Sequence, residues 1–366
     1  MVNPIVNRVV AELRREASRL RSSPLRIMPR PFLAAITTFT LNPGKLLRPT
    51  LFVMAFKAYQ RREPANLYRA ALAFEHLHNF ILMHDDIIDR SNLRRGRPAL
   101  HRSFARALRR FPNRRFTGED LAIVAGDMLY ALGLRGFSSI DVAPERRQRA
   151  LDIITETAVY TACGEFQELM LTLRPLPRVT LRHIIQVYDW KSAYYSFVAP
   201  LMTGAILAGA PAGETKVLAK IGILAGRAFQ LRDDLDNLTL AASRTGKPAH
   251  TDLDQGQRTL PLWLAYRHLP PAGRRALSKL LASPRRTPGR RRKLTTLIME
   301  SGAPGYGENM LLKFSAEISR LIADLHWPPS DRRELQRFVA GLVSPRPSAA
   351  VQSTRRRSAR RRDDGR

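Results

Sequence analysis

The chain has 366 residues, of which 44% are hydrophobic, so it is long and apolar enough to bury the core of one large domain or of two. Its 61 Lys and Arg outnumber 31 Asp and Glu, and the formal net charge of +30 favours anionic partners: phosphorylated substrates, a membrane surface or nucleic acid. The single cysteine, Cys163, excludes an intramolecular disulfide and favours a reducing, cytoplasmic location.

The positive charge is spread along the chain. The segment 346–366 holds eight Arg and two Asp, so it contributes +6 and leaves +24 on the rest. No compact basic module with interleaved aromatic residues stands out, so no nucleic-acid partner is expected. A peripheral membrane contact through the basic surface or the tail stays open, and nucleic-acid binding stays an alternative for the tail alone.

The N-terminal residues 1–25 mix Arg and Glu with apolar residues, which is typical of an amphipathic helix and not of a secretory signal. The most apolar stretch, Phe197–Gly213, is interrupted by Pro200 and Pro211. It is also shorter than the roughly 20 residues that a membrane-spanning helix needs. We therefore expect it to be a buried helix.

Nearly every segment shows apolar residues at i, i+3 and i+4, which is typical of helices, whereas alternating β-branched runs are missing. An all-α fold is therefore predicted. The predicted helices are Asn3–Leu20, Pro31–Thr38, Arg48–Arg61, Leu67–Arg90, Leu100–Phe111, Glu119–Ser139, Pro144–Leu173, Leu181–Gly209, Gly213–Leu240, Thr259–Arg267, Pro271–Ser283, Arg290–Ser301, Tyr306–Leu325 and Ser330–Leu342.

Two loops, Ser91–Ala99 and Ala241–Arg258, interrupt the helical pattern and carry charged residues. The end of the chain from Ser344 is rich in Pro, Ser and Arg and has too little apolar surface to fold. The sequence thus predicts one domain over residues 1–343 and a disordered tail over residues 344–366.

An acidic cluster lies inside the apolar segment that begins at Leu67. Asp85 and Asp89 are four residues apart, so on a helix they share one face, while Asp86 lies roughly 100° round the axis. Such carboxylates repel each other unless a divalent cation lies between them, and Mg²⁺ favours oxygen ligands together with substrate phosphates. For a single cluster of this kind, a solvated acidic face is the simpler alternative.

A second acidic pair, Asp233 and Asp234, follows Gln230 at the end of the apolar run Ile221–Leu231. Two acidic helices that face each other across a cavity would hold Mg²⁺ ions and one diphosphate group. A site of this kind promotes the departure of a diphosphate leaving group.

These motifs, in this order, resemble the polyprenyl synthetase family, the trans-isoprenyl diphosphate synthases, over about Gly44–Leu342. The resemblance implies the isoprenoid synthase fold, a single large helical bundle around a central cavity, and a homodimer. It also implies a prenyltransferase that condenses isopentenyl diphosphate with an allylic diphosphate by Mg²⁺-dependent ionisation, condensation and elimination. The residues that carry it are Asp85-Asp86-Ile87-Ile88-Asp89, Arg94-Arg95-Gly96-Arg97-Pro98, Phe229-Gln230 and Asp233-Asp234.

The resemblance assigns roles to individual residues. It implies that Asp85, Asp89 and Asp233 bind Mg²⁺, with about three ions per site. The implied catalytic set is Asp85, Asp86, Asp89, Lys191, Gln230, Asp233 and Asp234. The implied allylic-diphosphate residues are Arg94, Lys191 and Lys247; Ser192 and Gln230 are implied to bind substrate, with Gln230 stabilising the carbocation. The implied isopentenyl-diphosphate residues are Gly44, Lys45, Arg48, His78 and Arg95. We expect His84 only to orient its neighbours. The segments Gly126–Leu129 and Gly164–Glu168 should mainly provide close helix packing through their glycines, with polar support from their other residues.

Three positions depart from the family pattern. Ser192 stands where Thr is usual and keeps the hydroxyl. Asn237 stands where the second acidic motif usually has its third Asp, so we expect weaker metal binding there. Gln257 replaces a usual lysine, with Arg258 beside it as a substitute.

The length of the product depends on the depth of the apolar tunnel beneath the first motif. Phe80 lies five residues before Asp85, about 7 Å deeper at roughly 1.5 Å per residue, with Ile81 beside it. A phenyl ring there would end the tunnel after a few isoprene units, which predicts about C15 to C20 products, farnesyl or geranylgeranyl diphosphate. Simple core packing of Phe80, and with it a longer-chain synthase, is the alternative.

Two other functions remain open. A non-catalytic regulatory homologue would fit the departures at Asn237 and Gln257. A terpene cyclase would share the fold and an acidic motif, but it has no use for an isopentenyl diphosphate pocket. The residues of that pocket speak against it: Lys45, Arg48, His78 and Arg95.

Overall fold

The computed structural model describes residues 4–22, 24–239, 251–283 and 287–344. Its first elements are α1 (Pro4–Ser22), η1 (Pro24–Ile27), α2 (Arg30–Thr40), α3 (Leu47–Tyr59), α4 (Leu67–Ile88), β1 (Leu93–Arg94), β2 (Arg97–Pro98), α5 (Leu100–Ala107), η2 (Leu108–Arg110), α6 (Gly118–Ser138) and α7 (Pro144–Thr172). There follow η3 (Leu176–Arg178), α8 (Leu181–Val187), η4 (Tyr188–Val198), α9 (Ala199–Leu207), α10 (Ala212–Thr239), α12 (Thr251–Gln255), α13 (Leu260–His268), α14 (Pro271–Ala282), α15 (Pro288–Glu300), α16 (Ala303–Ala323) and α17 (Pro329–Val343).

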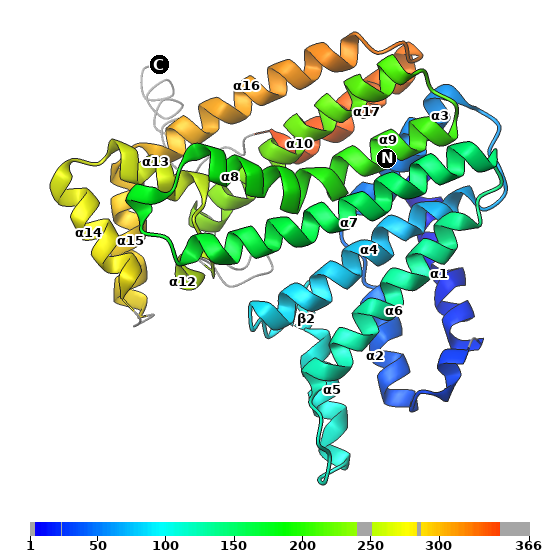
Figure 1. The fold of residues 1–366 in the computed structure, drawn as a ribbon, viewed down its shortest axis with the longest axis horizontal. Helices are drawn as coiled ribbons and strands as arrows, with labels where there is room; N and C mark the ends of the chain where they lie inside the picture. Colours follow the sequence, from blue (N-terminus) through cyan, green and yellow to red (C-terminus); the bar gives the residue numbers. More distant parts are fainter. Residues whose placement is uncertain (1–3, 23, 240–250, 284–286, 345–366) are drawn as a thin grey trace, which may run out of the picture.

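Long helices run side by side through the molecule, while the shorter α12 to α15 gather at one end (Figure 1). The all-α prediction is confirmed, and the predicted helix boundaries agree with the structure to within a few residues in most cases. Three predictions need correction: the loop Ser91–Ala99 contains strands β1 and β2, the loop Ala241–Arg258 contains α12, and the helix Leu181–Gly209 is three elements. Lys247 and the predicted tail from residue 345 lie outside the described residues.

The hairpin of β1 and β2 is made by a two-residue turn. Leu93 pairs with Pro98 and Arg94 with Arg97, and the turn residues Arg95 and Gly96 have φ angles of +52° and +74°. Two consecutive left-handed residues match the twist of a tight antiparallel hairpin. Two-residue strands are too short to produce an alternating pattern, which is why the sequence predicted a plain loop.

The segment η4 is a π-helix, in which hydrogen bonds reach back five residues; the N–H of Ala199 donates to the carbonyl of Tyr194. It ends just before Pro200, which has no N–H to donate and whose ring crowds the preceding turn. Neighbouring helices approach η4 through glycines. A Cβ at Gly164 of α7 would lie 2.5 Å from the backbone nitrogen of Lys191, and one at Gly226 of α10 would lie 2.3 Å from Ala193.

The helix α4 is the centre of the larger core, with residues such as Leu72, Phe74 and Leu77 buried. Phe74 lies 5.4 Å from Phe52 of α3, measured between ring centroids, so the first acidic motif stands at the end of a firmly packed helix. The predicted buried helix at Phe197–Gly213 is confirmed by α9, in which all but one residue is buried.

One described helix, α6, is long and apolar enough to cross a membrane by length and composition. Its contacts explain the composition without a membrane, because α6 packs along α4 through Gly126, Gly133 and Gly136. A single helix of this kind is weak evidence for a membrane span.

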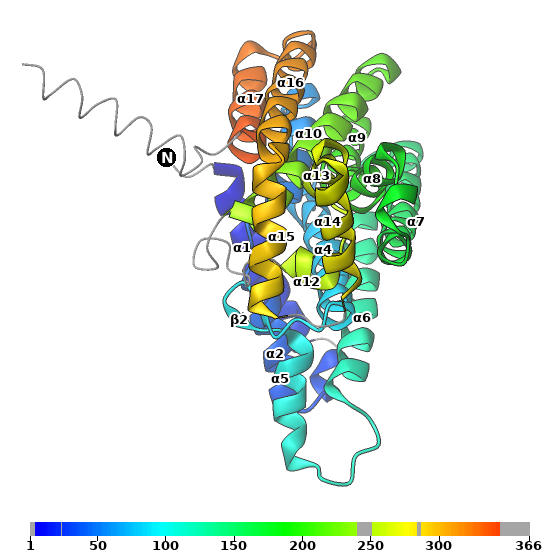
Figure 2. The same ribbon diagram turned by 90° about the vertical axis from the view of Figure 1, so that its left-hand side faces the viewer.

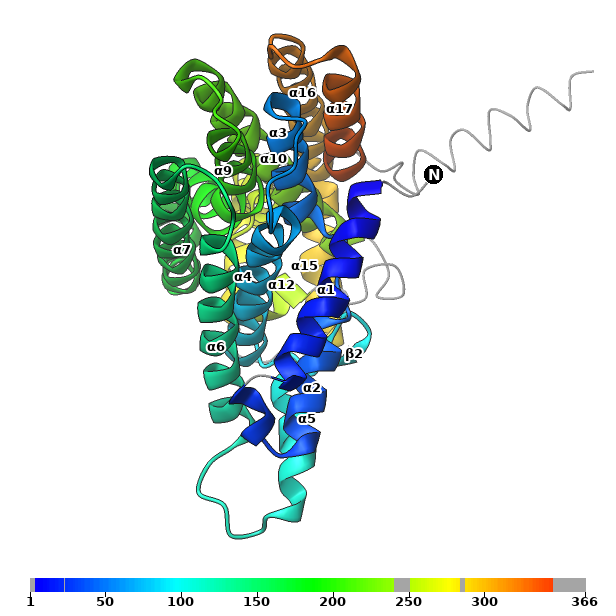
Figure 3. The same ribbon diagram turned by 90° about the vertical axis from the view of Figure 1, so that its right-hand side faces the viewer.

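At the opposite end from α16 and α17, helix α5 and the segment that joins it to α6 project away from the bundle (Figures 1, 2 and 3). A small second core holds this projection to the bundle: Phe104 of α5 lies 5.4 Å from Phe32 of α2, and both pack with Leu108 and Leu129.

Candidate active site

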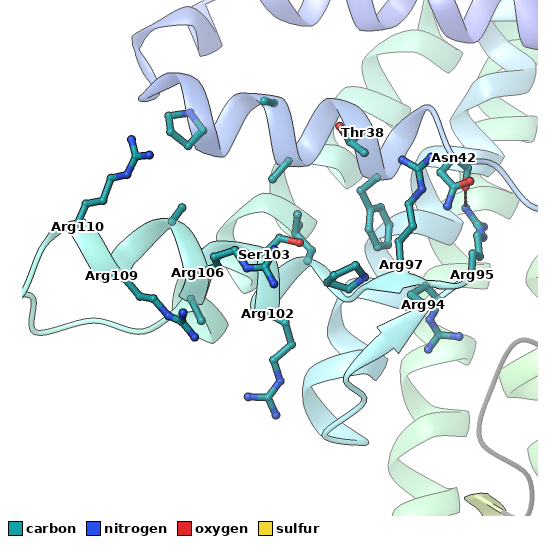
Figure 4. A pocket seen from close by; sticks show the side chains of 18 residues that line it. Thr38, Asn42, Arg94, Arg95, Arg97, Arg102, Ser103, Arg106, Arg109 and Arg110 are labelled. Carbon is teal, nitrogen blue, oxygen red and sulfur yellow. Dashed lines mark hydrogen bonds between the residues drawn. The ribbon is translucent and has the colours of Figure 1, made fainter.

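The hairpin turn divides the consecutive arginines between two places. Arg94 donates from Nε to Oδ1 of Asp86 at 2.9 Å, with a second bond from Nη2 to the same oxygen. Arg95 donates from Nη1 to the carbonyl of Asn42 at 2.6 Å, and Figure 4 shows its side chain directed toward Asn42 and away from Arg94. Adjacent residues thus serve the acidic motif on one side and the loop before α3 on the other.

In the first acidic motif the three carboxylates differ in exposure. Asp86 is completely buried and is held by Arg94, whereas Asp85 and Asp89 are half-buried. Burial, and then repulsion from Asp89, raise the pKa of Asp85 to about 6, although Lys191 and Arg94 act in the opposite direction. Asp85 and Asp89 are therefore the carboxylates of this motif that face an open side.

Lys191 of η4 lies among acidic groups of two helices, α7 and α4. Its Nζ is 2.5 Å from Oε2 of Glu165 and also contacts Glu168, both on α7. Burial alone would lower the pKa of Lys191, but the carboxylates of Glu168, Asp85 and Glu165 raise it well above its ordinary value. The ammonium group is therefore charged and ready to meet an anion beside Asp85.

The second acidic motif is tied to Lys191 through its neighbour Ser192. The Ser192 hydroxyl donates to Oε1 of Gln230 at 2.6 Å, and the Gln230 amide donates to Asp234 at 2.9 Å. The hydroxyl of Tyr188 also donates to Asp234, which is 3% exposed. Asp233, by contrast, is exposed. Hydrogen bonds and ion pairs thus join the motif on α10 to η4 and α7, and the charge of Lys191 links them electrostatically to Asp85 on α4.

Neutral partners do not balance the buried charge of Asp234. Burial, followed by the nearby charge of Asp252, raises the pKa of Asp234 well above its ordinary value, while Tyr188 and Gln230 act in the opposite direction. Asn237 donates to Oδ1 of Asp252 at 3.1 Å, so this departure from the family pattern connects α10 to α12.

Gln257 and Arg258 line a pocket of about 20 Å³ together with Glu168, Gln230 and Asp234. Gln257 donates to the side chain of Gln255 at 2.9 Å, and Arg258 donates to the carbonyls of Thr172 and Gly256 at 2.8 and 2.6 Å. Arg258 therefore lies at the carbonyl end of α7, beside the second motif.

The residues expected to hold the second substrate come together around the start of α3. The Gly44 loop lies against Arg95, because a Cβ at Gly44 would be 3.5 Å from Nε of Arg95. Arg48 is 7% exposed; it donates to Oγ of Ser196 at 2.8 Å and lies 4.2 Å above the ring of Tyr195. Lys45 extends from the same loop toward the ring of Phe229 on α10, 5.9 Å away.

Glu75 of α4 is the negative group of this basic cluster. It is 1% exposed and lies 3.6 Å from Nη2 of Arg95, while Arg48 also attracts it electrostatically. Burial raises the pKa of Glu75, although Arg95 and Arg48 act in the opposite direction. His78, one turn further along α4, lies 6.0 Å from Tyr195 between ring centroids, so it belongs to the same cluster.

Phe80 contacts aromatic residues on two helices below the first motif. Its ring lies 4.6 Å from His84 and 5.3 Å from Tyr130 of α6, and Ile81 beside it is half-buried. His84 lies within 3.2 Å of the carbonyl of Ile123 and, because a Cβ at Gly126 would lie 2.7 Å from its Nε2, Gly126 is needed for this approach.

The carboxylates of the two acidic motifs fit Mg²⁺, which takes part of its ligands from substrate and water. They do not fit a metal that is held by protein side chains alone. Among the residues that the structure describes, no three His, Cys, Asp or Glu side chains are gathered closely enough to hold a metal ion. Asp85, Asp89 and Asp233 offer only oxygen ligands, and Mg²⁺ commonly binds through one or two carboxylates with substrate phosphates and water supplying the rest.

Sequence reasoning missed the partners that these residues use. Glu165 and Glu168 contact Lys191 directly, where only packing with polar support was expected, while Tyr188, Glu75 and Tyr130 were not singled out. One signal was present: Glu75 is the single acidic residue within the apolar run that precedes His78 on α4.

Three comparisons with known proteins agree. Residues 30–298 match the family model for polyprenyl synthetase. The geranylgeranyl diphosphate synthase of Methanosarcina mazei is 32% identical over 217 residues, which are 59% of this chain and 62% of that protein. The octaprenyl diphosphate synthase of Escherichia coli is 31% identical over 225 residues, which are 62% of this chain and 63% of that protein. The chain thus spans less than two thirds of the length of either relative.

Among solved structures, a geranylgeranyl pyrophosphate synthase from Corynebacterium glutamicum, complexed with isoprenyl diphosphate and magnesium, has 25% identity and a TM-score of 0.86. The match covers 94% of this chain and all of that one. The fold of the chain is therefore that of these synthases.

Proposed function

The chain belongs to the polyprenyl synthetase family of prenyltransferases, and from this premise we propose that it joins isopentenyl diphosphate to an allylic diphosphate with trans geometry. The observation that carries the proposal is that Lys191 attracts Asp85 electrostatically, while its neighbour Ser192 is hydrogen-bonded to Gln230, which in turn donates to Asp234. It supports a single reaction centre between the two acidic motifs, as a diphosphate leaving group requires.

In this proposal the allylic diphosphate lies between Arg94 and Lys191. Both groups are charged at working pH, and each is already close to carboxylates that an incoming anion would partly replace as its partner. Lys247, which lies outside the described residues, is proposed to contact the same group. Asp85, Asp89 and Asp233 would hold Mg²⁺, about three ions per site, and bound Mg²⁺ supplies positive charge to the departing diphosphate.

The allylic C–O bond breaks, and the electron pair leaves with the diphosphate. Gln230 and Ser192 hold amide and hydroxyl dipoles in fixed positions beside the resulting carbocation, since each is bonded to the other. The double bond of isopentenyl diphosphate then forms the new C–C bond. The released diphosphate accepts the proton that is lost, so no nucleophilic side chain is required.

Isopentenyl diphosphate is proposed to bind in the basic cluster at the start of α3. Arg95 and Arg48 are already positioned by Asn42 and Ser196, and Lys45 with the Gly44 loop lies beside them. Glu75 beneath these cations keeps the cluster from repelling itself when the site is empty of anions. A terpene cyclase would need none of this cluster.

The assay that tests the function uses the purified full-length protein, Mg²⁺, radiolabelled isopentenyl diphosphate and each of three allylic primers, dimethylallyl, geranyl and farnesyl diphosphate. We expect butanol-extractable labelled product that EDTA abolishes and excess Mg²⁺ restores. Absence of product with every primer would contradict the proposal and favour the non-catalytic homologue.

For the product we propose about C15 to C20, because Phe80, Tyr130 and His84 form an aromatic group below the first motif. The names of relatives at about 30% identity range from farnesyl to octaprenyl diphosphate synthase, so family membership leaves the length open. A longer-chain synthase is the second candidate.

The variant Phe80→Ala tests whether the ring of Phe80 forms the floor of the product tunnel, that is, the point at which the growing chain stops. We expect its main product to be one or more isoprene units longer, measured by chromatography after dephosphorylation, because the tunnel then continues past the missing ring. Phe111→Ala, an identical truncation in the segment before α6, should leave the distribution unchanged. An unaltered distribution in Phe80→Ala would remove Phe80 from the floor.

We further propose that the protein is cytoplasmic and that its residues 1–343 form one domain. We also propose that it forms a homodimer through α6 and α7. Large apolar side chains of both helices, and of Leu173 just after α7, are exposed: Ile123, Val124, Val159, Phe166, Leu169, Met170 and Leu173. Such a patch on a monomer marks an interaction surface. Light scattering of the purified protein, with Val124→Glu and Phe166→Glu as disrupting changes, tests the dimer; a monomeric wild type would contradict it.

A further inference from the structure

The most positively charged projection of the molecule lies outside the reaction centre. We call residues 97–117, which comprise β2, α5, η2 and the segment leading to α6, the arm. It extends beyond the ends of α2 and α6 in all three views of the molecule (Figures 1, 2 and 3). The mechanism proposed above uses none of its residues.

The arm carries cations without acidic partners. Its seven arginines are Arg97, Arg102, Arg106, Arg109, Arg110, Arg114 and Arg115, and no Asp or Glu lies between them. Arg102, Arg106 and Arg109 fall at i, i+4 and i+7, so they share one helix face, where like charges repel. Within the part of the chain that the structure describes, no ion pair links any of the seven to a carboxylate. The arm is therefore a surface that attracts anions.

A hollow of about 710 Å³ lies between α2 and the arm, and at its hairpin end it is also lined by Arg94 and Arg95 (Figure 4). Its walls are partly apolar, with Ala34, Ala35 and Phe39 on one side and Leu100 on the other. A second hollow of about 520 Å³ lies on the other side of α5, bordered by Arg114, Arg115 and Phe116 and, at the start of α6, by Glu119. Arginines at the edge of a partly apolar hollow suit a ligand that has both an anionic group and an apolar part more than they suit a simple anion.

The end of the arm exposes two aromatic side chains. Phe111 is 50% exposed and Phe116 is 47% exposed, and each lies next to arginine in the sequence. The segment between them is ordered, because Arg114 donates to the carbonyls of Phe111 and Leu108 at 3.1 and 3.4 Å. The buried face of the arm, which includes Phe104 and Leu108, already fills its own core, so the exposed phenyl groups are not part of it.

We propose that the arm docks this protein on an anionic phospholipid bilayer. The arginines bind headgroup phosphates, while Phe111 and Phe116 enter the boundary between headgroups and acyl chains. Charge complementarity favours this occupant, and a soluble diphosphate would leave the exposed aromatic rings without a role. The inference goes beyond the proposed catalytic function and does not depend on it.

The test measures co-sedimentation of the full-length protein with vesicles of phosphatidylcholine alone or with 30% phosphatidylglycerol. We expect binding only to the anionic vesicles and weaker binding at higher salt. The variants Arg106→Gln/Arg109→Gln/Arg110→Gln and Phe111→Ser/Phe116→Ser should each lower partitioning by about tenfold or more. Wild-type partitioning in both variants would overturn the proposal.

The matched control is Arg149→Gln/Arg275→Gln/Arg333→Gln, which removes the same charge from exposed positions on α7, α14 and α17. It should change partitioning by less than about twofold. A loss equal to that of the arm variant would show a general charge effect and overturn the assignment to the arm. A chain that lacks residues 345–366 should still bind; loss of all binding would assign the interaction to that segment instead.

Two further readouts separate the occupants. In Phe111→Trp, tryptophan emission should shift to shorter wavelength with anionic vesicles and be quenched by brominated acyl chains, but should not respond to inorganic diphosphate. The same shift on adding duplex DNA, with none on adding vesicles, would overturn the proposal in favour of nucleic acid. Turnover of soluble substrates without vesicles should be unchanged in every arm variant, which shows that each is folded.

Discussion

The two acidic motifs are alike in sequence, and in both the second aspartate of the adjacent pair is buried while the first is more open. Their partners differ. Asp86 of α4 is held by the guanidinium of Arg94, whereas Asp234 of α10 is held by the phenol of Tyr188 and the amide of Gln230. One buried carboxylate is thus neutralised and the other is not.

The two aspartates of each adjacent pair thus have different roles, which the sequence of the motif does not reveal. In each pair the more accessible aspartate, Asp85 or Asp233, is the one that we propose as a metal ligand, and the buried one is held by other side chains. The partners of Asp234 are neutral, and its pKa is raised well above the ordinary range, with burial as the main cause. The four predictions below test this division, in order of decreasing effect.

Asp85→Ala should lower kcat/KM by about a thousandfold, because an accessible carboxylate beside Lys191 and the diphosphate is lost. Circular dichroism should show unchanged helicity. The control is Asp236→Ala in the second motif, whose carboxylate lies 3.8 Å from Arg232 on another face of α10; it should retain activity within about threefold. Comparable losses of kcat/KM in both variants would show that the accessible Asp85 is no more important for activity than Asp236.

Asp86→Asn should lower the free energy of unfolding by about 3 kcal/mol, because it leaves the buried charge of Arg94 without its counterion. The equivalent change Asp234→Asn should cost less than about 1 kcal/mol, since an amide resembles the protonated carboxyl that this site favours. Urea unfolding at neutral pH measures both. Equal losses in the free energy of unfolding would show that charge matters equally at Asp86 and Asp234.

Gly164→Ala should lower the free energy of unfolding by about 2 kcal/mol, because its Cβ would meet the backbone of Lys191, which links the two motifs. In Gly213→Ala the new methyl group meets nothing within 4 Å. That variant should be as stable as the wild type or more stable by up to about 1 kcal/mol. A neutral effect at Gly164 would mean that α7 can move away from η4 without loss.

Asn237→Asp should lower the Mg²⁺ concentration for half-maximal activity by about threefold, because a second carboxylate then stands beside Asp252. Gln148→Glu adds the same charge on α7, far from the motifs, and should have no effect. A higher Mg²⁺ requirement in Asn237→Asp would show that repulsion from Asp252 outweighs metal attraction.

The sequence predicted the helices and the residues of both motifs well, because apolar periodicity and clustered carboxylates are local signals. It did not predict the pairing of Arg94 with Asp86 or of Tyr188 with Asp234, which are 8 and 46 residues apart. Nor did it reveal the π-helix, since no residue pattern distinguishes hydrogen bonds to the fifth residue from those to the fourth. Partners across the fold depend on packing that a single sequence does not display.

The π-helix at 188–198 also makes the spacing of this segment a functional property. Deleting one residue ahead of Lys191 would return the chain toward 3.6 residues per turn and carry the following side chains roughly 100° out of phase. The ammonium group and the Ser192 hydroxyl would then leave the face on which they meet Glu165 and Gln230. An insertion or deletion in this segment should therefore be more harmful than a substitution, even when Lys191 and Ser192 are retained.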